Sequence, residues 1–140
     1  MQNTGKLSEQ IWEDHHTRLG KRAYFTRLVD ASEIKGRTGK VATSARSQPS
    51  DYILTMDGIT SYCEVKSTGN KTSFPFNLLR PSQTGPAKQI LAAGGQYWIY
   101  VHALALNRWF RIPYDAILAA KNEGLGSLKW SDLERTSWYP

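Results

Sequence analysis

The fold is decided by residues 51–66, which read DYILTMDGITSYCEVK. Residues 51–56 and 59–66 are rich in β-branched, aromatic and other apolar side chains, which is typical of strands. Between them, Asp57-Gly58 suits a type I′ turn, in which both central residues take positive φ angles. The stretch therefore predicts a β-hairpin.

The second strand of this hairpin has two different faces, because successive side chains of a strand point to opposite sides of a sheet. Cys63 and Val65 share one face with each other, and Glu64 and Lys66 share the opposite face. The hairpin also lays Asp51, at the start of the first strand, beside the second strand. Two carboxylates and a lysine are therefore predicted to converge.

Further elements are predicted on both sides of the hairpin. Residues 7–19 place apolar side chains on one helical stripe that Gly20 ends, and residues 23–29 suit a strand. Residues 68–85 are typical of a loop. The elements predicted after it are a helix from Pro86 to about Ala93 ended by Gly94-Gly95, a buried strand over 96–106, a turn at Asn107-Arg108, a strand over 109–112, a helix over 114–122 ended by Gly124, and a short helix or turn at the S-x-x-E sequence 131–134. This order predicts a mixed α/β fold.

Composition limits the classes to which the chain can belong. Its 140 residues suit one domain over 1–140, and 18 Lys and Arg against 12 Asp and Glu give a net charge of +6. Such a charge favours a polyanionic partner, although it is equally consistent with simple solubility. Cys63 is the only cysteine, which excludes an intrachain disulfide and a cysteine-based zinc site. With no apolar stretch of membrane-spanning length, we expect a soluble cytoplasmic protein without membrane partners.

Asp51, Glu64 and Lys66 suit the hydrolysis of a phosphodiester. Mg²⁺ prefers oxygen ligands, so two carboxylates on adjacent strands can hold it against the scissile phosphate. A lysine on the face of the glutamate can orient the attacking water and offset the charge of the transition state.

Each of these residues also has a simpler explanation. Asp51 is suited to an Asx turn, and Glu64 with Lys66 is equally consistent with a solvent-facing pair on an amphipathic strand. The E-x-K triplet is a common pattern on its own. The upstream aspartate, the hairpin and the basic charge together favour a nuclease, with a non-catalytic DNA-binding module as the alternative from another class.

Other polar residues are candidates for supporting roles. Glu9 on the first helix is a candidate to complete the metal site, with Glu13 one turn later as a competitor and a solvated surface charge as the alternative. Gln83, Lys88 and Gln89 are candidates to contact phosphate or metal-bound water, unless they are simply surface residues. Residues 33–48 are rich in Gly and basic side chains and predict an exposed basic loop. The lysines and arginines predicted to contact DNA are Lys35, Arg37, Lys40, Arg46, Lys71 and Lys88.

Several of these motifs resemble the RecU family of Holliday junction resolvases, within the PD-(D/E)xK nuclease superfamily. The similar segments are Ser50-Asp51-Tyr52, Glu64-Val65-Lys66, residues 70–75, Gln83 and Lys88-Gln89, with weaker similarity at Gly5 to Glu9, residues 132–134 and residues 139–140. RecU proteins are longer and carry a protruding basic stalk, for which only residues 33–48 are available here. The smaller size resembles phage or archaeal resolvases, which implies a bacterial, archaeal or phage-infected cell.

The resemblance implies a restriction-endonuclease-like fold, with a central mixed sheet flanked by helices. It implies Asp51 and Glu64 as metal ligands, Lys66 as the catalytic lysine, Glu9 as a metal-site or supporting acid and Gln83 as an auxiliary residue. The implied activity is a Mg²⁺-dependent endonuclease, with Mn²⁺ able to substitute, that acts as a homodimer and cuts symmetric strands of a four-way DNA junction in recombination and repair. The nearest alternative is a nuclease of this superfamily that cuts flaps, single strands or a duplex site.

Overall fold

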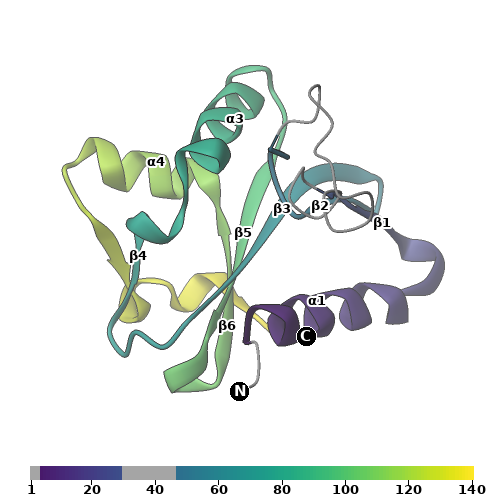
Figure 1. Ribbon diagram of the computed structural model, residues 1–140, viewed down its shortest axis with the longest axis horizontal. Coiled ribbons are helices and arrows are strands. Elements are labelled where there is room, and N and C mark those ends of the chain that lie inside the picture. Colours follow the sequence, from purple (N-terminus) through teal and green to yellow (C-terminus); the bar gives the residue numbers. More distant parts are fainter. Residues whose placement is uncertain (1–3, 30–46) are drawn as a thin grey trace, which may run out of the picture.

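The computed structural model describes residues 4–29 and 47–140, which build a six-stranded sheet and a smaller two-stranded sheet (Figure 1). The order of the large sheet is β1-β2-β3-β5-β6-β8, and only β3 and β5 run parallel. Its strands are β1 (Ala23–Arg27), β2 (Tyr52–Met56), β3 (Ile59–Thr68), β5 (Tyr97–Ala103), β6 (Arg108–Pro113) and β8 (Ser137–Trp138). The small sheet pairs β4 (Ser73–Pro75) with β7 (Ser127–Lys129).

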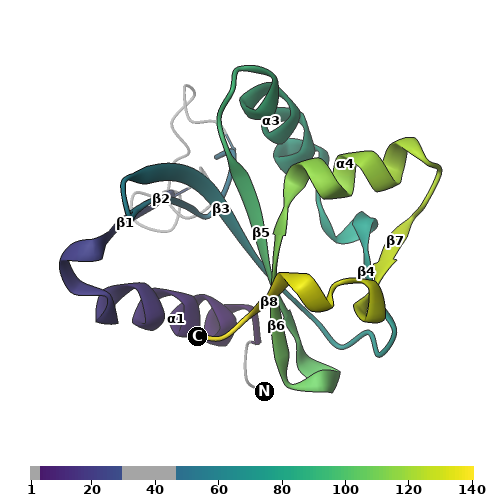
Figure 2. The same cartoon turned by 180° about the vertical axis from the view of Figure 1, so that it is seen from behind.

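Helices cover both faces of the large sheet (Figures 1 and 2). The α-helices are α1 (Thr4–Arg18), α3 (Pro81–Ala92) and α4 (Tyr114–Asn122), and the 3₁₀ turns are η1 (Gly20–Arg22), η2 (Phe76–Leu78), η3 (Leu104–Leu106), η4 (Trp130–Asp132) and η5 (Glu134–Thr136). The first helix lies on one face, while α3 and α4 lie on the other. The prediction of a central mixed sheet flanked by helices is confirmed. Within the described residues, no helix is both long and apolar enough to span a bilayer.

The predicted hairpin is confirmed, and its turn has the expected backbone. Asp57 and Gly58 have φ angles of 50° and 84°, as a type I′ turn requires. The Arg22 guanidinium donates to both oxygens of the Asp57 carboxylate at 3.0 Å, which ties the turn to the chain entering β1. The register then sets Tyr52 opposite Cys63.

Strand β3 divides its side chains between two hydrophobic cores, as the alternation predicted. Cys63 and Val65 join the core beneath α1, whereas Tyr62 packs against the core beneath α3 and α4. At the centre of the α1 core, the fully buried Trp12 ring stacks on Tyr52 with centroids 4.2 Å apart. Two aromatic rings on facing elements therefore fix the helix on the sheet.

The helix α3 begins earlier than predicted. It starts at Pro81 rather than Pro86, because Pro81 takes the first helical position, where its missing N–H costs nothing. The Gln83 Oε1 accepts a hydrogen bond from the Arg80 backbone N–H at 3.0 Å and closes this first turn. Pro86 lies inside the helix, where it gives up one backbone hydrogen bond. The prediction of a loop over residues 68–85 is wrong in part, because this segment contains β4, η2 and the first turn of α3.

The C-terminal third matches its predictions except that its first strand is shorter, and the predicted short helix or turn at 131–134 is confirmed. The helix over 114–122 has the predicted bounds, and Gly124 follows it with a φ of 88°. The strand predicted over 96–106 ends at Ala103, and Asn107 makes the turn with a φ of 50°. No side-chain cap forms at 131–134. That segment contains parts of η4 and η5, and η5 leads into β8 beside β6.

The Trp12 stack generates a stability prediction. Trp12→Ala should lower the free energy of unfolding by about 3 to 5 kcal/mol, because it removes a fully buried tryptophan from the α1 core and leaves a cavity. Urea unfolding followed by circular dichroism measures the change. Tyr24→Ala is the matched control, since Tyr24 is 75% exposed and its loss should change the value by less than about 0.5 kcal/mol. Equal values for the two variants would contradict a central role for Trp12.

Candidate active site

Asp51 stands immediately before β2 and is held at both its backbone and its side chain. Its Oδ2 accepts a hydrogen bond from the Val65 backbone N–H at 2.9 Å, across the hairpin. Its carbonyl accepts one from the Leu28 N–H at 2.8 Å, just beyond the end of β1. The carboxylate is therefore oriented by two neighbouring segments, which is the preorganisation that a catalytic ligand needs.

The two residues before Asp51 are anchored as well. The Tyr97 hydroxyl of β5 donates to the Pro49 carbonyl at 2.5 Å. The buried Ser50 hydroxyl donates to the Tyr52 carbonyl at 2.8 Å. Hydrogen bonds from β5 and within its own strand thus fix this Pro-Ser-Asp segment, and it cannot shift without breaking several of them.

Glu64 is the most unusual side chain of the site, because it is a carboxylate with only 2% of its surface exposed. Its Oε2 is buried and has no hydrogen-bond partner. Burial raises the pKa of Glu64 well above its usual range, and a hydrogen bond with the Asp51 carboxyl and the charge of Asp51 raise it further. A charged Glu64 is therefore costly in the metal-free protein.

Two cations oppose this cost. Lys66 and Arg80 both favour the charged form and lower the pKa of Glu64, although the raising effects are larger. Lys66 is half-buried two residues further along β3, on the same face as Glu64, as predicted. Arg80 is exposed and directly precedes α3.

The pair Asp51 and Glu64 suits a divalent cation. A buried carboxylate oxygen with no partner, beside a second carboxylate, is a set of hard oxygen donors that a Mg²⁺ ion would satisfy. Among residues 4–29 and 47–140, no three or more His, Cys, Asp or Glu side chains are grouped to hold a metal. Any cation here would take its remaining ligands from water, backbone or DNA, as Mg²⁺ commonly does.

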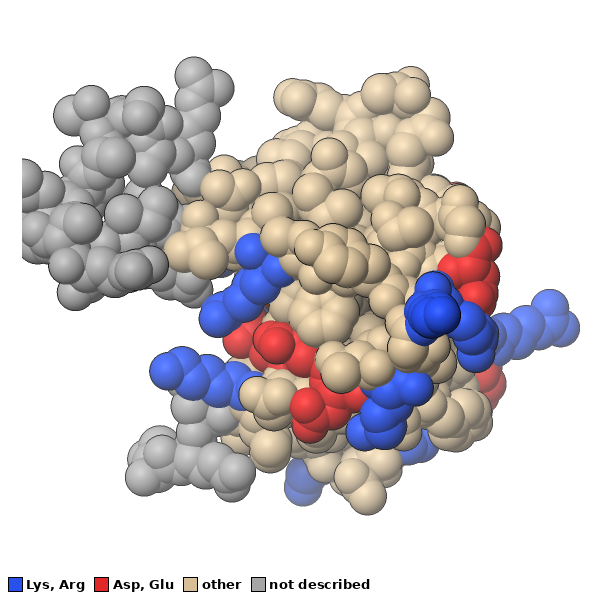
Figure 3. All heavy atoms as spheres, turned by 90° about the vertical axis from the view of Figure 1, so that its right-hand side faces the viewer, with Lys and Arg blue, Asp and Glu red and all other residues tan. Residues whose placement is uncertain are grey.

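Neither helix glutamate therefore forms a three-residue group with Asp51 and Glu64 in the described part of the chain. The Oε2 of Glu13 accepts a hydrogen bond from the Tyr52 hydroxyl at 2.6 Å. The Oε2 of Glu9 lies 3.7 Å from the Nη2 of Arg27. Both residues belong to α1. Figure 3 shows one side of the molecule, on which acidic side chains gather between Lys and Arg side chains. The supporting role of Glu9 remains a prediction.

The other residues predicted for the site lie on different elements of the fold. Gln83 is buried at the start of α3, where its side chain holds the Arg80 backbone. Lys88 is exposed on α3, and Lys71 is exposed in the loop between β3 and β4. Most of the predicted basic loop, with Lys35, Arg37, Lys40 and Arg46, lies outside the described residues.

Arg80 is a site residue that sequence reasoning missed. With a helix predicted from Pro86, Arg80 was expected in a loop with no assigned partner. The signal that could have found it is the Arg80-Pro81 pair followed by Gln83, because proline at the first helical position and glutamine at the third are typical of a helix start. That start is what brings the arginine close enough to influence Glu64.

Comparison with solved structures reveals a similar fold. Hjc, a Holliday junction resolvase from the archaeal hyperthermophile Archaeoglobus fulgidus, superposes with a TM-score of 0.50 over 89% of this chain and 88% of that chain. This likeness confirms the predicted restriction-endonuclease-like fold, a central mixed sheet flanked by helices. The two sequences are only 11% identical, so the likeness concerns the fold alone. No protein-family model and no curated protein matches the sequence.

The burial of Glu64 generates a prediction for stability without metal. Glu64→Gln should raise the free energy of unfolding in EDTA by roughly 1 to 3 kcal/mol at pH 8, because a glutamine is neutral in both states, whereas the Glu64 carboxyl ionises more readily in the unfolded chain than in the folded protein. The pKa of Glu64 is higher in the folded than in the unfolded protein, so the folded state binds more protons above the ordinary glutamate pKa of about 4.3. Wild-type stability should therefore fall as pH rises from 5 to 8, and the gain from Glu64→Gln should grow over the same range.

Urea unfolding of both proteins at several pH values measures this gain. Added Mg²⁺ should stabilise the wild type and leave Glu64→Gln nearly unchanged, because binding to the folded state alone stabilises it. Glu123→Gln is the control, since Glu123 is an exposed carboxylate just after α4. A gain that is independent of pH, or equal for Glu123→Gln, would contradict the buried carboxylate.

Proposed function

We propose that the protein is a Mg²⁺-dependent DNA endonuclease that resolves four-way junctions. The observation that carries the proposal is the buried Glu64 carboxylate beside Asp51, with Lys66 on the same face of β3, within a PD-(D/E)xK nuclease fold. A buried carboxylate with a strongly raised pKa beside a second carboxylate is a recognised mark of catalytic centres. The basic charge of +6 supports a nucleic acid as the partner.

Asp51 and Glu64 are the residues that would hold Mg²⁺, and Mn²⁺ would substitute because it accepts the same oxygen ligands. A bound divalent ion supplies charge at the scissile phosphate and lowers the pKa of a water molecule. The Val65 N–H fixes the Asp51 carboxylate in its orientation. The Lys66 ammonium, held on the same strand, orients the attacking water and offsets the negative charge that develops at phosphorus. Arg80 adds positive charge beside Glu64.

Four-way junctions are proposed as the substrate on two grounds. Hjc, which has a similar fold, is a Holliday junction resolvase, and the motifs around Asp51 and Glu64 resemble RecU resolvases. A non-catalytic DNA-binding module is disfavoured, because burying Glu64 beside Asp51 lowers stability and adds repulsion toward phosphate without helping a pure binder. Flaps, single strands and duplex sites are the competing substrates for the same chemistry.

A substrate panel tests the proposal. Labelled four-way junction, flap, duplex and single strand are incubated with the protein in Mg²⁺ and in EDTA. The junction should be cut fastest, by paired nicks that leave 5′-phosphate and 3′-hydroxyl ends, and EDTA should stop all cutting. Faster cutting of a flap or a single strand would identify that DNA, and not the junction, as the substrate. If no DNA is cut, the proposal that the protein is a nuclease is wrong.

Asp51→Asn should abolish cleavage without abolishing binding. Affinity comes mainly from Lys and Arg at the phosphates, and removal of a carboxylate reduces repulsion, whereas the rate should fall by several orders of magnitude because a metal ligand is lost. Ca²⁺ in place of Mg²⁺ should likewise allow wild-type binding and suppress cutting, since its looser coordination positions water and phosphate poorly. Gel shifts and cleavage time courses on one junction measure both effects.

Asp132→Asn is the control for this variant, because Asp132 is exposed in η4 and lies outside the site. It should cut at the wild-type rate. A folded Asp51→Asn protein that also cuts at a near wild-type rate would remove Asp51 from the site.

We also propose that the active protein is a homodimer. A two-fold pair of sites matches the two-fold symmetry of a four-way junction and gives paired nicks. Light scattering at micromolar protein should therefore give twice the mass of the chain, with and without junction DNA. A monomer mass under conditions in which the junction is cut in pairs would contradict the dimer.

A further inference from the structure

An open cavity of about 680 Å³, lined mostly by polar and charged residues, lies where the small sheet meets the turns that follow it. It lies between the loop after β3, the β4–β7 pair and the turn η4. Six of its lining residues carry the argument, namely Lys71, Ser73, Arg108, Ser127, Lys129 and Ser131. Its volume falls within the range of small-molecule sites and is sufficient for a phosphate with its attached sugar.

The backbone around this cavity is held rigidly. Asn70 Oδ1 accepts hydrogen bonds from the N–H groups of Thr72 and Ser73 at 3.0 Å each, which makes an Asx turn around Lys71. The Trp130 N–H donates to the Thr72 carbonyl, and its indole N–H donates to the Asn70 carbonyl, both at 3.0 Å. The cavity is therefore preformed and does not depend on a mobile loop.

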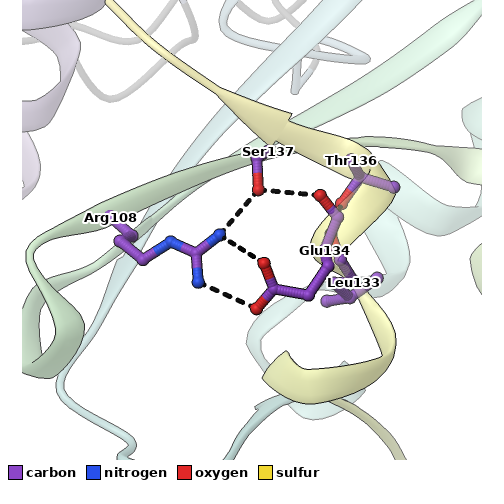
Figure 4. A network of polar contacts seen from close by, with 5 residues as sticks. All are labelled: Arg108, Leu133, Glu134, Thr136 and Ser137. Carbon is purple, nitrogen blue, oxygen red and sulfur yellow. Dashed lines mark hydrogen bonds and ion pairs between the residues drawn. The ribbon is translucent and has the colours of Figure 1, made fainter.

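The only acidic side chain that lines the cavity, within the described chain, is already neutralised. Figure 4 shows the Arg108 guanidinium donating to both oxygens of Glu134, at 2.9 and 2.8 Å, and to the Ser137 hydroxyl at 2.7 Å. This bidentate pair lowers the pKa of Glu134, so the carboxylate stays charged and paired at neutral pH. Arg108 and Glu134 cancel in charge and form a wall of the cavity.

Two lysines then give the cavity its net charge. Lys71 and Lys129 line it, and neither forms an ion pair within residues 4–29 and 47–140. The antiparallel register sets Ser73 opposite Lys129, so a hydroxyl and an ammonium group arise side by side. Together with the hydroxyls of Ser127 and Ser131, this surface offers several donors to an anion.

From these observations we infer that the cavity is a second, non-catalytic phosphate site, in which Lys129 and Lys71 bind a backbone phosphate of the DNA. The inference rests on the proposed nuclease function. Serine hydroxyls and two ammonium groups suit a phosphate diester, and the absence of an unpaired carboxylate removes the repulsion that would oppose it. The site would hold the strand in register with Asp51 and Glu64.

The position of the cavity along the chain agrees with this role. Strand β3, which carries Glu64 and Lys66, ends at Thr68 and leads directly into the loop with Lys71. Lys66 and Lys71 are five residues apart, so their Cα atoms are at most about 18 Å apart. Each nucleotide of a strand advances about 3.4 Å along a duplex, so the bound phosphate would lie within roughly five nucleotides of the cut.

Salt-dependent affinity tests the inference without requiring cleavage. Anisotropy of a labelled junction in EDTA is measured over a range of salt concentrations for wild type, Lys129→Ala and Lys71→Ala/Lys129→Ala. The log–log slope should fall by roughly one unit per lysine, because each lost contact releases one counterion fewer. Lys129→Arg should keep the slope. Lys121→Ala is the matched control, since it removes one lysine from the last turn of α4, outside the cavity, and it should also keep the slope.

A neutral methylphosphonate placed at each position within five nucleotides of the cut then locates the phosphate. One position should weaken wild-type binding and leave the double variant unaffected. Equal slopes for Lys129→Ala and Lys121→Ala, or the absence of such a position while the wild type cuts normally, would overturn the phosphate site alone. If the wild type cuts no DNA but the slopes differ as expected, the nuclease proposal fails and the phosphate site stands.

Discussion

The constraint on which the site depends is the burial of the Glu64 carboxylate beside Asp51. Ionisation of both carboxyl groups in this dehydrated place is opposed by burial and by their mutual repulsion, and one of the Glu64 oxygens has no hydrogen-bond partner. Such an arrangement persists only if the surrounding structure is stable enough to impose it. Here the imposed strain is electrostatic, and a divalent cation bound by both carboxylates would relieve it. The carboxyl pair that lowers the stability of the metal-free protein is thus the pair that is suited to bind a metal ion.

The stability that holds this pair comes from the middle of the sheet. Strand β3 pairs with β2 on one side and β5 on the other, so its backbone is fixed along both edges. On one face, Cys63 and Val65 pack in the core with Trp12 and Tyr52. The opposite face carries Glu64 and Lys66. Because a strand alternates its side chains, rigid apolar packing on one face positions polar chemistry on the other.

The same strand connects the two polar regions of the molecule. It carries Glu64 and Lys66 in its middle and leads into the Lys71 loop, so the carboxylate pair and the lysine cavity are linked by a few residues of fixed backbone. In the first region a cation would be bound, and in the second an anion. Folds of this kind serve many functions, so the specificity of the protein must reside in such side chains rather than in the sheet itself.

Much of the fold could be predicted from the sequence, because it depends on local rules. The Asp57-Gly58 turn, the alternation along β3 and the glycines that end helices are decided by backbone sterics and by nearest neighbours. The start of α3 was misplaced because two prolines compete for one role, and the partners of Gln83 decide between them. The convergence of Asp51, Glu64 and Lys66 was likewise predictable from strand geometry. Only the tertiary structure decided that Glu64 is buried, that Arg80 acts on it and that Lys129 joins Lys71. Those properties depend on which segments, distant in the sequence, pack around each side chain. That packing is determined by the whole fold and not by the local sequence.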